Sequence, residues 1–134
     1  MSRAVPPATL DKQRLASDPA RSVWVSANAG SGKTHVLSQR VVRLLLEGVN
    51  PSRILCLTFT KAAAANMSER VFAILARWTQ LDDDGLTAAI RATGAPNPSA
   101  ADLIAARRLF ARAVETPGGL KIQTIHAFCE RLLH

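Results

Sequence analysis

Eight consecutive residues have the composition of a phosphate-binding loop, namely Ala27, Asn28, Ala29, Gly30, Ser31, Gly32, Lys33 and Thr34. Small residues let backbone N–H groups approach phosphate oxygens closely, and Gly30 and Gly32 supply the necessary freedom. In such a loop the lysine holds the β- and γ-phosphates of ATP and the threonine hydroxyl reaches Mg²⁺. The usual pattern GxxxxGK[ST] begins with glycine where this chain has Ala27. The alternative is an ordinary Gly/Ser turn with an incidental lysine.

The segments that flank this loop support the nucleotide interpretation. Val23, Trp24 and Val25 form a short apolar run that is typical of a strand. After the loop, apolar residues recur at helical spacing until Gly48 and Pro51 end the pattern. A helix placed there would direct the positive end of its dipole at a bound anion.

Further strands and helices alternate along the chain. We expect an apolar strand over Arg53–Phe59 at the centre of a parallel sheet, covered on both faces. A helix from Lys61 to about Thr79 should follow, and later a third strand over Leu120–Ile125 and a helix over His126–Leu133. This alternation predicts an α/β fold with a parallel sheet flanked by helices, in which ligands gather at the carboxyl ends of the strands.

The middle of the chain has a less regular pattern. Asp82, Asp83 and Asp84 predict a solvated linker without chemistry of its own, and residues 80–100 are expected to be linker or loop, with a short helix over Leu86–Arg91. Ser99 and Asp102 have capping-box spacing and predict a helix that continues to Thr116. Its three arginines favour a solvated face over phosphate contacts: Arg107, Arg108 and Arg112.

Composition places this chain of 134 residues in the globular class, as one domain or part of one, with residues 1–9 expected to be flexible. No run of 18 apolar residues is present, so we expect no membrane association and a cytoplasmic location. The net charge of +7 fits a polyanionic partner but is weak support by itself. Cys56 and Cys129 lie in apolar patterns without a CxxC partner, which predicts buried free thiols.

Four segments in order resemble the motifs of superfamily 1 DNA helicases of the UvrD/RecB class: Leu10–Gln13, the phosphate loop, Leu57–Val71 and Thr124–Leu133. Within that class, the lysine directly after Thr58-Phe59-Thr60 and the sequence TIHAFC resemble the AddA and RecB recombination proteins, AddA most closely. The resemblance implies a RecA-like P-loop NTPase that uses ATP and Mg²⁺ and moves on single-stranded DNA during double-strand break repair. Gln13 would then read the edge of adenine, since its amide carries both a donor and an acceptor.

The same resemblance implies DNA contacts at the ends of the second and third strands. Phe59 offers a face on which an unpaired base can stack, and four residues can reach phosphate or sugar oxygens: Thr60, Lys61, Thr124 and His126. Two alternatives are that Phe59 belongs to the core and that His126 makes only a local hydrogen bond. The chain also departs from the family pattern at His35, where relatives have arginine, and at Asn66, where glutamate is common.

Parts that a helicase needs for catalysis are missing from the sequence. Hydrolysis requires an acidic strand end and arginines from a second domain, and beyond Lys33 we find no candidate catalytic residue. We therefore expect an incomplete, N-terminal portion of a RecA-like domain that binds ATP but does not unwind DNA alone. The parent protein would act on single-stranded or duplex DNA, and further possibilities are a nuclease region and a second, AddB-like subunit. The alternatives are a small P-loop kinase or metabolic ATPase, and a non-catalytic nucleotide-binding module.

Overall fold

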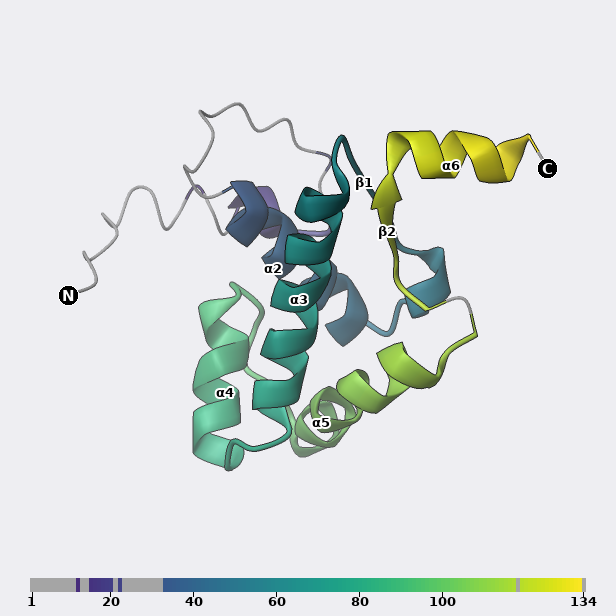
Figure 1. Ribbon diagram of the computed structural model, residues 1–134. Coiled ribbons are helices and arrows are strands. Elements are labelled where there is room, and N and C mark those ends of the chain that lie inside the picture. The colour runs from purple at the N-terminus through teal and green to yellow at the C-terminus, as the bar shows by residue number, and fades with distance from the viewer. Residues whose placement is uncertain (1–11, 13–14, 21, 23–32, 118, 134) are drawn as a thin grey trace.

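The computed structural model describes residues 12, 15–20, 22, 33–117 and 119–133 (Figure 1). The described part is a helix-rich α/β structure with a small sheet. Its elements in chain order are α2 (Lys33–Leu46), the 3₁₀ helix η1 (Pro51–Arg53), β1 (Leu55–Thr58), α3 (Lys61–Trp78), α4 (Asp83–Ala92), α5 (Ala100–Glu115), β2 (Lys121–Thr124) and α6 (Ile125–Leu132). The expected strand over Val23–Val25 lies outside the described residues.

The sheet joins β1 and β2 in parallel. Leu55 pairs with Lys121, and Thr58 at the other end pairs with Thr124. The chain between the strands contains α3, α4 and α5, which is the helical crossover that a parallel pair requires. The second and third predicted strands are thus confirmed, and both end at the same edge of the sheet.

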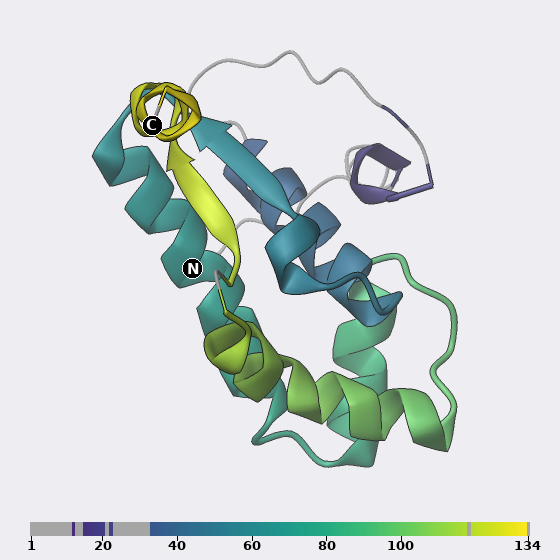
Figure 2. The same ribbon diagram turned by 90° about the vertical axis from the view of Figure 1, so that its right-hand side faces the viewer.

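Helix α3 lies at the centre of the core (Figure 2). Its apolar side carries Met67, Val71, Leu75 and Trp78, all of them buried. This side packs against α2, α5 and the sheet, so one helix contacts most of the described structure. Across the contact with α5, the rings of Phe72 and Phe110 meet edge to face with centroids 6.1 Å apart.

Residues 83–92 form helix α4, so the prediction of a linker over 80–100 was wrong for this stretch. Asp82 accepts a hydrogen bond from the Gly85 N–H and caps the helix, while Asp83 and Asp84 lie in its first turn. Carboxylates stabilise that end because the helix dipole is positive there. The acidic run therefore starts a helix, which the sequence pattern indicated only at Leu86–Arg91.

Helix α5 begins with the predicted capping box. Ser99 accepts from the Asp102 N–H at 3.1 Å, and the Asp102 carboxylate accepts from the Ser99 N–H at 2.9 Å. Arg107 on this helix is less solvated than expected. Its guanidinium donates to the Leu81 carbonyl at 3.1 Å and forms an ion pair with Asp83 at 2.6 Å, so it ties α5 to the start of α4.

Two expectations about burial were wrong. Leu55 and Leu57 are 42% and 43% exposed, so β1 is not covered on both faces within the described structure. Side chains alternate along a strand, and only the face with Cys56 and Thr58 is half-buried. Cys129 is exposed, because α6 buries none of its residues. Cys56 is a half-buried free thiol.

Candidate nucleotide and DNA site

Three helices begin on the same side of the molecule, seen at the top of Figure 1, where both strands also end. They are α2, α3 and α6, and none has an acidic residue in its first turn. Unpaired N–H groups and the helix dipole make each helix start weakly positive. This side of the molecule therefore favours an anion.

Lys33 and Thr34 are the first two residues of α2. Lys33 is exposed, as a side chain that binds a ligand phosphate must be, and Thr34 is half-buried. Ser38, which is 1% exposed, donates to the Thr34 carbonyl at 2.7 Å and also contacts the Met67 sulfur at 3.5 Å. The start of α2 is thereby held against α3.

Thr34 lies close to the end of β1. It lines a cavity of about 340 Å³ together with Thr58 and the half-buried Cys56. A threonine hydroxyl is a suitable single ligand for Mg²⁺, which usually keeps several waters and phosphate oxygens as its other ligands. No group of three or more His, Cys, Asp or Glu gathers in the described ranges, so a metal here would depend on the nucleotide for most of its ligands.

The other predicted nucleotide residues lie outside the described residues: Gln13, Ala27, Asn28, Ala29, Gly30, Ser31 and Gly32. The segment after position 13 is nevertheless attached to α2. Arg40 donates to the carbonyls of Ala16 at 3.2 Å and Asp18 at 2.9 Å, and Arg43 lies 3.8 Å from the Asp18 carboxylate. The chain next to the expected adenine-reading residue is thus fixed to the helix that begins with Lys33.

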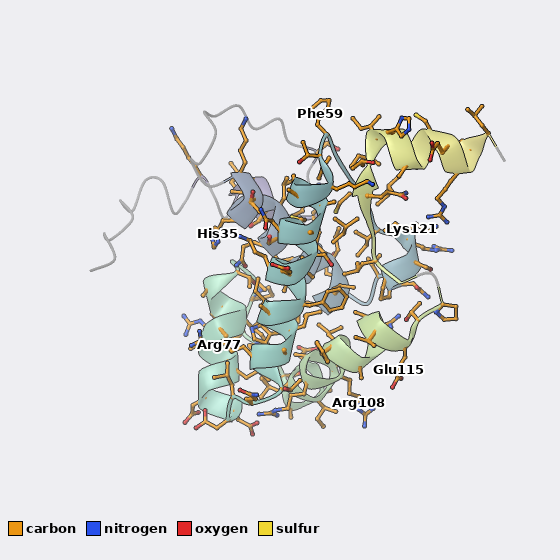
Figure 3. All side chains as sticks on the ribbon, in the orientation of Figure 1. His35, Phe59, Arg77, Arg108, Glu115 and Lys121 are labelled. Carbon is orange, nitrogen blue, oxygen red and sulfur yellow. The ribbon has the colours of Figure 1, made fainter. Side chains whose placement is uncertain are left out.

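Two residues, Phe59 and Thr60, connect β1 to α3. Phe59 is 91% exposed, so the core interpretation was wrong, and Figure 3 shows its ring at the top of the molecule, pointing outward. Thr60 caps α3 by accepting from the Ala63 N–H at 3.0 Å, and its carbonyl accepts from the Thr58 hydroxyl at 3.0 Å. These bonds fix the connection and present the aromatic ring to solvent. Lys61, the first residue of α3, is also exposed.

β2 passes into α6 without an intervening residue. Thr124 is 9% exposed and caps α6 by accepting from the Ala127 N–H at 3.1 Å. His126 is exposed, and its Nε2 lies 3.0 Å from the Glu130 carboxylate, so the expected local interaction is present. The imidazole has a second nitrogen, and the threonine hydroxyl still has a proton to donate.

Helix capping is the part of this site that the sequence motifs did not indicate. Thr60 and Thr124 occupy equivalent positions, each at the end of a strand and directly before a helix. A signal was present, because threonine is favoured as an N-cap and both precede a helical pattern. The contact between Ser38 and Met67, 29 residues apart, had no signal in the sequence.

The arrangement suits binding better than bond cleavage. Exposed cations, positive helix starts and an exposed aromatic ring can hold phosphates and a base. Neither described strand ends in a carboxylate that could position a water molecule or a metal ion, since the final residues are Thr58 and Thr124. Among the described helices none has the length and apolarity to cross a membrane.

Comparison with known families identifies the class. The UvrD/REP helicase N-terminal domain matches residues 9–134, nearly the whole chain, and the chain belongs to this family. The resemblance inferred from the four motifs is confirmed. No solved structure matches the chain.

Curated relatives point to one branch of the family, the A-type (AddA) polypeptide of the ATP-dependent helicase/nuclease. The relative so named from Limosilactobacillus reuteri is 34% identical over 122 residues, or 91% of this chain and 8% of that protein. The protein of the same name from Pediococcus pentosaceus is 30% identical over 93% of this chain and 9% of its own length. In Levilactobacillus brevis the identity is 60% over 50 residues, 37% of this chain and 4% of the relative. The chain therefore spans less than a tenth of the length of these relatives.

Proposed function

We propose that this chain is the nucleotide-binding part of an ATP-dependent DNA helicase that moves along single-stranded DNA and serves recombinational double-strand break repair. The observation that carries the proposal is the meeting of three helix starts at the edge where β1 and β2 end. Family membership and the names of the relatives support the same activity.

In this proposal Gln13, the loop Ala27–Gly32 and Lys33 hold ATP. Thr34 is the protein ligand of Mg²⁺, and its place beside Thr58 supports a nucleotide close to the sheet edge. Bound magnesium would neutralise phosphate charge. The fold would be the beginning of a RecA-like domain, of which the described parallel pair and its helical crossover form part.

Single-stranded DNA would lie across the starts of α3 and α6. Phe59 would stack on a base, Lys61 and His126 would contact phosphates, and Thr60 and Thr124 would donate their hydroxyl protons to backbone oxygens. Because base stacking tolerates every sequence, this grip should show no base preference. Duplex DNA, a nuclease region, a cytoplasmic location and a second, AddB-like subunit belong to the same proposal for the parent protein.

Binding of a fluorescein-labelled oligothymidylate across a salt series tests the proposal. We expect weak binding that falls with salt, and Phe59→Ala should weaken it about 5- to 150-fold, since a stacked base is worth about 1–3 kcal/mol. Lys61→Gln should reduce the slope of log affinity against log salt by about 0.7, the value for one phosphate contact. Fluorescence anisotropy measures both quantities.

Matched controls are Leu132→Ala and Arg91→Gln, which remove an exposed apolar and an exposed charged side chain away from this edge. Neither should change affinity or slope. A small-molecule kinase would give no salt-dependent DNA binding, so the absence of any such binding, with ATP binding intact, would favour that alternative.

A further inference from the structure

A groove on another part of the surface has no role in the proposed function. It lies between the end of α2 and helix α5, which passes below α2 in Figure 2, and it has a volume of about 300 Å³. Its lining comprises Leu45, Leu46 and Gly48 from the α2 side, with Ala101, Ile104, Ala105, Ala106, Arg108, Leu109 and Arg112 from α5. The lining contains no acidic residue.

The floor of the groove is made of small side chains and its wall is apolar. Gly48, Ala101 and Ala105 leave room for an incoming group, because none of them extends beyond a methyl. Ile104 is 53% exposed beside them, an unusual exposure for a branched apolar side chain. The groove thus offers an apolar slot that water fills poorly.

Two arginines border this slot. Arg108 and Arg112 lie one helical turn apart on α5, both are exposed, and neither forms an ion pair with any described residue. Figure 3 labels Arg108 on the outer side of α5. Arg107 on the same helix differs, because it is bound to Asp83. Acidic residues near the rim are Glu47, next to Gly48, and Glu115, three residues after Arg112.

We propose that this groove binds an amphipathic acidic helix of a partner protein. A leucine-type side chain of the partner would enter the slot, and carboxylates one turn apart on the partner would pair with Arg108 and Arg112. Nucleic acid fits the site less well, because its phosphate backbone has no group that would cover the exposed Ile104 and the alanines. The binding surface is separate from the edge with Phe59 and Lys61.

The probe for a test is a fluorescein-labelled, alanine-based helical peptide with two leucines flanked by glutamates at one-turn spacing. We expect it to bind the chain, and R108Q/R112Q should weaken binding at least about tenfold through loss of both charge-assisted contacts. Ala105→Leu, which fills the slot from an exposed position, should weaken binding similarly. A peptide with glutamine in place of glutamate should bind the unmodified chain as weakly as the original peptide binds R108Q/R112Q.

The matched control is R70Q/R77Q, which removes the same charge from α3 at positions outside the groove. It should bind the peptide like the unmodified chain, and the groove variants should bind ATP and oligothymidylate normally, so failure here is distinct from failure of the helicase proposal. The inference is overturned if the peptide does not bind or if R108Q/R112Q binds it unchanged. It is equally overturned if a labelled DNA duplex binds these two arginines more tightly than the peptide does.

Discussion

Lys33 is the residue on which nucleotide binding should depend most. It begins α2 with an exposed side chain, where its charge adds to the positive helix start. Lys33→Ala should lower the affinity for ATP at least about tenfold, since a charged hydrogen bond is worth about 1.5–3 kcal/mol. Titration with a fluorescent ATP analogue measures the change.

Oligothymidylate binding by the same variant should remain within about twofold, because the predicted DNA contacts come from other helix starts. Lys121→Ala at the opposite end of β2 is a suitable charge control and should keep full ATP affinity. ATP binding that survives loss of Lys33 would rule out a phosphate loop at this position.

The two cysteines should differ in reactivity. Burial raises the pKa of the Cys56 thiol above its ordinary value, and Cys129 is exposed on α6. The thiolate is the reactive form, so at mildly alkaline pH iodoacetamide should modify Cys129 first. The rate at Cys56 should rise with pH through a range above that of an ordinary thiol. Mass spectrometry of the modified peptides follows both sites.

Cys129→Ser isolates the slower reaction, and its Cys56 rate should equal that of the unmodified chain. Equal rates at the two cysteines would show that β1 opens easily, and would contradict the packing of its Cys56 face.

At the scale of elements, α4 is a structural helix and not a linker. Leu86 is fully buried within it, and Leu86→Ala should lower the free energy of unfolding by about 2–5 kcal/mol through loss of apolar burial and the cavity left behind. Urea denaturation followed by circular dichroism measures this. Leu132→Ala, at a 69% exposed position, is the control and should change stability by about 0.5 kcal/mol or less.

The helices and strands show where sequence patterns are informative. The α3 pattern was clear, because Met67, Val71 and Leu75 mark one face and the observed helix ends one residue from the prediction. The α4 pattern was ambiguous, since three adjacent carboxylates suit a linker as well as a helix start, and burial of Leu86 decides between them. Exposure of Leu55 was not predictable, because an apolar strand does not reveal which of its faces a neighbour covers.

The candidate site was predictable to a similar extent. Motif order identified Lys33, Phe59 and His126 together, and the structure places the latter two at the same sheet edge. Their surroundings were not predictable in this way. The capping bond of Thr60 and the pairing of His126 with Glu130 depend on backbone geometry that residue types alone leave open.

At the scale of the whole molecule, we expect binding without turnover. The described strands end in Thr58 and Thr124, with no carboxylate to position water for attack on the γ-phosphate. Purified chain with ATP, Mg²⁺ and oligothymidylate should therefore release phosphate no faster than its Lys33→Ala variant. A coupled phosphate-release assay provides the measurement. Turnover that DNA accelerates would show that the described residues supply a catalytic group that has been overlooked.

The two-residue connection before α3 gives that helix the properties of a lever. Its 18 residues extend over roughly 27 Å at about 1.5 Å per residue. A tilt of about 5° at Thr60 would move the opposite end, where Trp78 is buried, by roughly 2 Å, a shift that close-packed side chains do not absorb without rearrangement. A displacement of the backbone beside Phe59 would thus be amplified at the far end of the core.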